Sequence, residues 1–145
     1  MSGGQGRVGR FVAAATIVVG LFYLVGGVWL LVGPHSFFDT LAVFRPYSRH
    51  FLHDAGAFQI GLGVTVLLAL RIADALLVVL TGASVGAWFH VAAHVMDRHI
   101  GGRPSTDIPG LVALALLGSA AAVARAVTRS SPRSREERAS SEASG

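Results

Sequence analysis

The stretch FVAAATIVVGLFYLVGGVWLLV, residues 11–32, decides the fold. It runs for 22 residues without a charge, which is long enough for a helix to cross a bilayer core of about 30 Å at about 1.5 Å per residue. A backbone that crosses lipid finds no water for its amide groups, so this segment has to be helical. The sequence therefore predicts a transmembrane helix.

Three more apolar segments follow it. Residues 75–96 are interrupted only by His90 and His94, while residues 55–70 and 108–124 reach spanning length once flanking residues are added. We predict an all-α fold, an integral membrane four-helix bundle, with spans at about 10–32, 50–71, 75–97 and 108–125.

The two terminal segments differ from the spans in composition. Residues 1–9 are Gly-rich and basic, and residues 126–145 contain mainly Ala, Ser, Arg and Glu. Segments of this kind bury too little apolar surface to fold, so we expect both to be disordered. The first apolar run is too long for a cleavable signal peptide, and no A-x-A-like cleavage site follows it.

Composition excludes several classes of protein. With 52% apolar and 14% charged residues, the chain does not resemble a soluble domain. It has no cysteine, which excludes disulfides, iron–sulfur clusters and thiolate zinc sites. The net charge of +4 comes from arginines beside the spans, where they set orientation. We therefore predict the lipid bilayer as the main partner and no nucleic-acid partner.

The distribution of the 12 arginines predicts the orientation. If the amino terminus is cytoplasmic, four arginines lie outside: Arg45, Arg49, Arg98 and Arg103. The other eight lie inside: Arg7, Arg10, Arg71, Arg125, Arg129, Arg133, Arg135 and Arg138. This excess matches the positive-inside rule. We predict a multi-pass protein of the cytoplasmic (inner) membrane with both termini in the cytoplasm.

The first outer loop is expected to contain a short interfacial helix. Residues 36–39 have the S-x-x-D form of a capping box. Pro46 is expected to end the short helix, and Ser48 or Arg49 to begin the second span.

The inner turn, residues 71–74, is so short that the second and third spans should form an antiparallel hairpin in direct contact. Asp74 suits the N-cap of the third span, and Asp107 that of the fourth, with Pro109 in its first turn. Small residues four apart predict close helix contacts. The residues assigned to helix packing are Ala57, Gly61, Gly82 and Gly86.

All six histidines fall on the outer side in this topology: His35, His50, His53, His90, His94 and His99. On the third span, His90 and His94 continue the face of Gly82 and Gly86, and Asp97 extends it. We expect the glycine half of this face to press on a neighbouring helix, so that the histidines point into the bundle. Ionisable groups at that depth are costly in lipid and indicate a candidate functional site.

The second span offers partners for these histidines. If the hairpin holds the outer ends of both spans together, His53 and Asp54 lie beside His90 and His94. A carboxylate hydrogen-bonded to an imidazole fixes the histidine tautomer for metal binding or proton transfer. The primary candidates are His53, Asp54, His90, His94 and Asp97, and the secondary candidates are His35, His50 and His99.

This cluster leaves several functions open. Two imidazoles four residues apart can ligate zinc, and one can ligate haem iron, although HVAAH at residues 90–94 lacks the glutamate of H-E-x-x-H enzymes. The cluster could instead bind a lipid headgroup, a quinone or another small hydrophobic ligand, or catalyse acid–base chemistry on a lipid or isoprenoid-like substrate. It could also be an interhelical hydrogen-bond network in an accessory subunit of a membrane complex or in a homo-oligomer. The sequence leaves the cofactor unknown and the question of enzymatic activity open.

Three motifs carry a family resemblance: GPHSFFD at residues 33–39, PYSRHFLHDAGA at 46–57 and WFHVAAHVMDRH at 88–99. Over residues 10–125 the chain resembles a group of small four-helix integral membrane proteins of actinobacteria that are DoxX-like in architecture. The resemblance implies the four-helix fold. It implies no particular activity, cofactor or partner.

Overall fold

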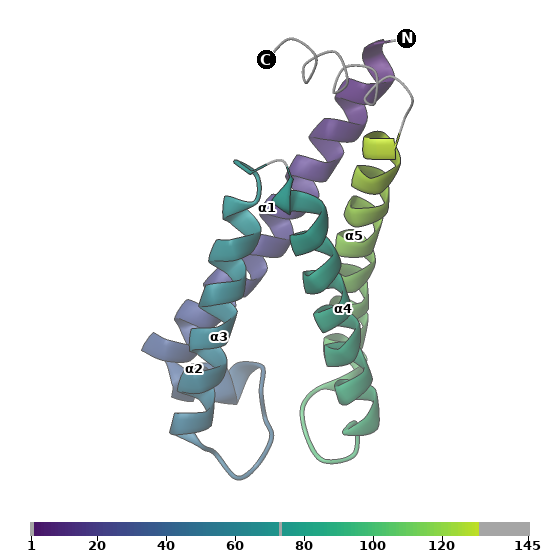
Figure 1. Ribbon diagram of the computed structural model, residues 1–145. Helices are drawn as coiled ribbons and strands as arrows, with labels where there is room; N and C mark the ends of the chain where they lie inside the picture. The colour runs from purple at the N-terminus through teal and green to yellow at the C-terminus, as the bar shows by residue number, and fades with distance from the viewer. Residues whose placement is uncertain (1, 73, 131–145) are drawn as a thin grey trace.

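The computed structural model describes residues 2–72 and 74–130. This part of the chain contains five helices and no strand: α1 (Ser2–Val32), α2 (Pro34–Thr40), α3 (Arg49–Leu68), α4 (Ala75–Met96) and α5 (Pro104–Ser130). All but α2 are long and apolar enough to cross a membrane (Figure 1). The predicted fold class, an all-α bundle with four candidate membrane spans, is confirmed.

The bundle has two distinct ends (Figure 1). The terminal end holds the start of α1, the turn between α3 and α4, and the end of α5. The loop end holds α2 and the two loops at residues 41–48 and 97–103.

Two helices extend further than predicted. The amino-terminal segment, residues 1–9, was expected to be disordered, but α1 already begins at Ser2. Extending an existing helix adds a hydrogen bond per residue without a new nucleus, which offsets the poor propensity of its glycines. The last span begins at Pro104, not at about residue 108, and reaches Ser130. The rest of the expected tail, residues 131–145, lies outside the described residues.

The caps of the helices differ from the prediction in three places. α2 starts at Pro34 after the N-cap Gly33, so Ser36 lies inside the helix, where its hydroxyl accepts a hydrogen bond from Trp29 Nε1 (2.7 Å). Asp74 stands at the N-cap of α4 without a capping hydrogen bond. Asp107 lies inside the first turn of α5, where its carboxylate accepts a hydrogen bond from the Arg103 N–H (2.7 Å).

The second span begins at Arg49, one of the two starts predicted, after the N-cap residue Ser48. The Ser48 hydroxyl accepts a hydrogen bond from the Phe51 N–H (3.3 Å) at the start of α3. The short helix α2 is also present in the first loop, although it ends at Thr40, well before Pro46.

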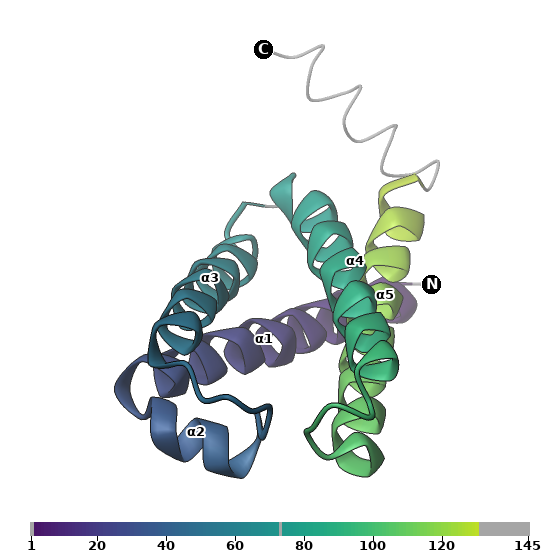
Figure 2. The same cartoon turned by 90° about the horizontal axis from the view of Figure 1, so that it is seen from below.

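The helices pair differently from the prediction. α1 packs along α3, and α4 packs along α5, whereas α3 and α4 approach each other near their connecting turn and diverge toward the loop end (Figures 1 and 2). The predicted hairpin in direct contact is therefore wrong over most of its length. A short turn fixes only the near ends of two helices, and packing decides the rest.

Glycines explain why α1 and α3 form the close pair. A Cβ on Gly27 would lie 2.7 Å from the Gly56 carbonyl oxygen, and a Cβ on Gly63 would lie 2.6 Å from the Leu24 nitrogen. A side chain at these positions would push the two backbones apart. Close approach of backbones is how membrane helices gain packing energy, since lipid supplies no hydrophobic drive between them.

The residues predicted to pack helices lie elsewhere. Ala57, Gly61, Gly82 and Gly86 are exposed on the surface of the bundle. A Cβ on any of the three glycines would meet nothing within 4 Å. The four-residue spacing was present, but these faces do not meet another helix of this chain.

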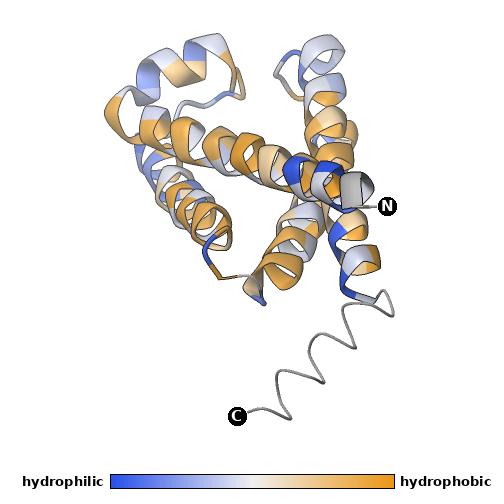
Figure 3. Ribbon diagram, turned by 90° about the horizontal axis from the view of Figure 1, so that it is seen from above, coloured by the Kyte–Doolittle hydropathy of each residue, from blue (hydrophilic) through white to orange (hydrophobic). Residues whose placement is uncertain are grey.

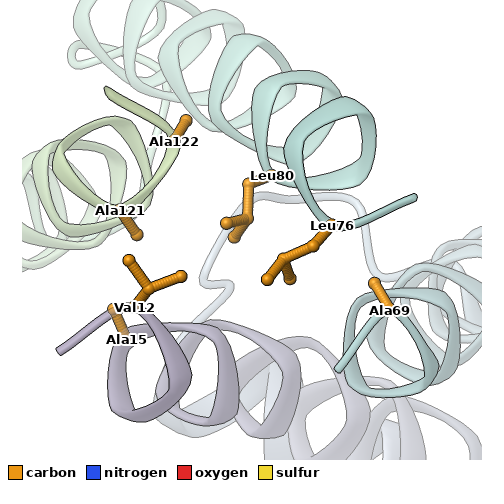
Figure 4. Close-up of a cluster of buried hydrophobic side chains, with 7 residues drawn as sticks. All are labelled: Val12, Ala15, Ala69, Leu76, Leu80, Ala121 and Ala122. Carbon is orange, nitrogen blue, oxygen red and sulfur yellow. The ribbon is translucent and has the colours of Figure 1, made fainter. Parts of the chain in front are cut away.

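The core is continuous at the terminal end and divided at the loop end. The cluster in Figure 4 combines side chains of α1, α4 and α5 with Ala69, the residue after α3: Val12, Ala15, Ala69, Leu76, Leu80, Ala121 and Ala122. A central cluster still joins the four helices: Val19, Tyr23, Val66, Ala83 and Leu114. Toward the loop end the core consists of two separate clusters. One joins α1, α2 and α3 through Leu30, Phe38 and Leu52, and the other joins α4 and α5 through Ala87, Val91 and Ala115.

Most residues of the long helices are hydrophobic (Figure 3), and many of their large apolar side chains are exposed. Val32 and Phe58 are 80% and 82% exposed, for example. Contiguous exposed apolar surface of this extent indicates contact with lipid. The packing and the surface together fit a multi-pass membrane protein.

Candidate functional site

The imidazole pair of α4 is the centre of the candidate site. His90 and His94 are half-buried, and their ring centroids lie 4.9 Å apart. The helix places them one turn apart on the same side, beside the buried Val91. His90 lies about 9 Å below the end of α4 at Met96, at about 1.5 Å per residue. The site is therefore at the loop end, within the apolar part of the helix.

Phe44 from the first loop completes the site. Its ring meets the His94 ring edge to face, with centroids 5.8 Å apart and planes at 87°. The Gly102 N–H of the second loop donates a hydrogen bond to the Val43 carbonyl (3.2 Å) beside it. A Cβ on Gly101 would lie 2.5 Å from the same carbonyl oxygen. The two loops thus contact each other and hold Phe44 against α4.

Neither imidazole of the pair has a hydrogen bond to any described residue. Among the described residues, no carboxylate pairs with either imidazole, and neither imidazole takes part in an interhelical hydrogen bond. A polar group at membrane depth is costly unless something satisfies it. His90 and His94 are therefore free to hydrogen-bond a molecule from outside the chain.

The structure does not assemble the other primary candidates around this pair. Asp54 pairs with His50 on the exposed surface of α3, with His50 Nε2 3.5 Å from Asp54 Oδ2. Asp97 is the exposed C-cap residue of α4. His53 is half-buried on α3, and its Nε2 is buried without a hydrogen-bond partner in the described chain.

No group of three or more His, Asp or Glu side chains within residues 2–72 and 74–130 could hold a metal ion. The physical reason is the divergence of α3 and α4. A similar position along two neighbouring spans does not place two residues side by side.

The secondary candidates are separate from one another. His35 stacks on Tyr47, with ring centroids 4.2 Å apart and planes at 19°. His50 is the partner of Asp54, and His99 is exposed beyond the end of α4. The first contact joins α2 to the loop at residues 41–48, the second lies within α3, and neither involves the pair on α4.

Sequence reasoning missed Phe44 as a site residue. The prediction did not include the loop-to-loop contact that positions it. Gly102, whose φ of 75° suits glycine, marks the tight turn on the other side of that contact. An aromatic in one loop and a Gly-Gly pair in another were the only signals available.

A second missed feature is the polar link between α4 and α5. Trp88 Nε1 donates a hydrogen bond to Ser119 Oγ (3.1 Å), which donates to the Ala115 carbonyl (2.7 Å). This link ties the two helices near the depth of His90.

No family model, curated protein or solved structure matches the chain. Its function has to be inferred from its own residues.

Proposed function

We propose that the protein binds a small amphipathic molecule or a lipid headgroup at the loop end, where α3 and α4 diverge. His90 and His94 are the hydrogen-bonding groups, and the Phe44 ring is an apolar wall. The observation that carries the proposal is a pair of half-buried imidazoles at membrane depth without a hydrogen-bond partner among the described residues.

The chemistry of the pair suits such a ligand. A neutral imidazole donates one hydrogen bond and accepts another, so two of them can bind a hydroxyl, carbonyl or phosphate group. Ligand sites in membrane bundles combine apolar walls with a few placed polar groups, which the Phe44 ring and the two imidazoles provide. At the loop end the buried cluster of α1, α2 and α3 is separate from that of α4 and α5, and Val91, between His90 and His94 in the sequence, belongs to the second cluster.

We further propose the cytoplasmic membrane as the location, with the terminal end in the cytoplasm. The excess of arginine at that end supports this orientation through the positive-inside rule. Membership of the DoxX-like group stays a proposal, and the four-helix architecture is its only support.

The test uses the full chain purified in mild detergent. A His90→Leu/His94→Leu variant removes both polar groups at similar volume, and a His50→Leu/His99→Leu variant removes two exposed imidazoles as a matched control. Native mass spectrometry and metal analysis of each protein then report what co-purifies. We expect a small molecule or lipid that is retained by the wild type and the control and lost from the first variant.

The same variants separate binding from scaffolding. Because the imidazoles at 90 and 94 have no hydrogen-bond partner among residues 2–72 and 74–130, we expect the double variant to keep its unfolding free energy within about 0.5 kcal/mol. A large loss of stability would mean that the pair holds the bundle together. An identical set of co-purified molecules in all three proteins would refute the proposed site, and a stoichiometric metal lost only from the 90/94 variant would make it a metal centre.

A further inference from the structure

A groove on the surface of α3 lies at the opposite end of the bundle from the histidine pair. It has a volume of about 360 Å³, near the lower limit of about 300 Å³ for ligand pockets. Four apolar residues and one arginine line it: Val64, Leu67, Leu68, Leu70 and Arg71. The apolar residues belong to the last turns of α3 and to the turn that follows.

The walls of the groove suit an acyl chain. Leu67 is held in place by α1, because it occupies the space where a Cβ on Gly20 would lie 2.7 Å away. Val64 and Leu68 are 41% and 48% exposed, so the groove opens on the lipid-facing side of α3. A groove of this size and polarity accommodates part of one lipid tail.

The charge at the mouth of the groove is not neutralised by the described chain. The Arg71 side chain is exposed and has no hydrogen bond or ion pair within the described residues. The only carboxylate of the described chain at the terminal end is Asp74, which pairs with Arg129 instead (Asp74 Oδ1 to Arg129 Nη2, 3.4 Å). The last α3 carbonyls are also occupied, since the Arg71 N–H donates to the Leu68 carbonyl (2.9 Å). Arg71 therefore offers a positive charge that no described residue neutralises, next to an apolar groove.

We propose that this groove binds an anionic phospholipid, with an acyl chain along Val64, Leu67 and Leu68 and the phosphate at Arg71. Apolar walls favour a lipid over a free phosphate ion. A guanidinium forms charge-assisted hydrogen bonds with phosphate oxygens, and basic residues next to a span attract anionic headgroups. This site is independent of the histidine pair at the loop end.

The test measures binding of two lipids that share their tails. The delipidated full chain in detergent is titrated with dioleoyl phosphatidylglycerol or dioleoyl phosphatidylcholine, and bound lipid is counted by native mass spectrometry. We expect the wild type to prefer the glycerol lipid by about fivefold, which corresponds to about 1 kcal/mol for one basic residue near an anionic surface. Arg71→Gln should abolish this preference. Arg49→Gln, at the other end of the same helix, should retain it.

A second pair of variants tests the groove itself. Val64→Trp fills it and should weaken binding of phosphatidylglycerol, whereas Val78→Trp on the exposed surface of α4 should not. The proposal is refuted if the wild type shows no preference, or if Arg49→Gln loses it as well. If Val64→Trp binds phosphatidylglycerol as tightly as the wild type does, or if glycerol phosphate competes as well as the whole lipid, the protein recognises the headgroup alone. Either result would refute the proposed role of the groove.

Discussion

Replacing Gly63 by alanine tests the pairing of α1 with α3 directly. The added Cβ would lie 2.6 Å from the Leu24 nitrogen and 2.9 Å from the Gly20 carbonyl oxygen, both backbone atoms of α1. Ordinary contact begins at 3.4 Å, so α1 has to move away by about 0.8 Å. Backbone cannot rotate aside as a side chain can, and overpacking of this kind costs about 1–3 kcal/mol. We expect Gly63→Ala to destabilise the protein by that amount.

The matched control is Gly61→Ala, two residues earlier on the same helix. Gly61 is exposed, and a Cβ there meets nothing within 4 Å. We expect no loss of stability, since alanine has the better helix propensity. The assay is reversible unfolding of the purified chain in mixed micelles, with helicity followed by circular dichroism. The inferred pairing is wrong if Gly61→Ala destabilises as much as Gly63→Ala, because the opposite face of α3 would then be the packed one.

Three further changes probe the packing that surrounds the site. Ser119→Ala removes the acceptor of Trp88 Nε1 and should lower the unfolding free energy by about 0.6 kcal/mol, the average for hydrogen bonds between membrane helices. A double-mutant cycle with Trp88→Phe should give a coupling energy of that size, and purely additive effects would contradict the hydrogen bond. Gly102→Ala adds a Cβ to a residue with a φ of 75°, and this Cβ would lie 2.8 Å from the Phe44 ring. We expect the unfolding free energy to fall by at least about 1–2 kcal/mol in the same assay, and an unchanged value would contradict the contact between the two loops. Phe38→Ala empties a 7% exposed position between α1 and α3 and should cost about 3–5 kcal/mol, unless α2 lies away from the bundle.

The four spans could be predicted because spanning length is a local property of the sequence. Residues 11–32 show it without any knowledge of the rest of the chain. The ends of the spans were less accurate, because a helix that lipid and packing have already nucleated can continue through residues with poor propensity. Ser2 and Pro104 are the clearest cases.

Helix pairing could not be predicted from the same information. Glycines four apart, at 82 and 86, suggested a contact, whereas the contact uses glycines seven apart, Gly20 with Gly27 and Gly56 with Gly63. Spacing says which residues share a face, and it does not say which face meets another helix. Only the three-dimensional packing of α1 against α3 shows which glycine-containing faces are in contact.

The partners of the histidine pair could not be predicted for the same reason. His90 and His94 were correctly placed on one face because they lie on one helix. Their proposed partners on α3, His53 and Asp54, depended on a hairpin that diverges. Phe44 was reachable only through a contact between two loops, for which the sequence has no periodicity to follow.

The division of the core has a consequence for biosynthesis. The first pair of packed helices, α1 and α3, occupies residues 2–68, and the second, α4 and α5, occupies residues 75–130. Each pair is a contiguous piece of the chain, so the ribosome delivers a complete antiparallel pair before it starts the next. Insertion into the membrane can therefore proceed pair by pair. The apolar cluster at the terminal end would then form last, when the two pairs pack against each other. Two fragments divided in the turn after Arg71 should still find each other when they are synthesised in the same cell.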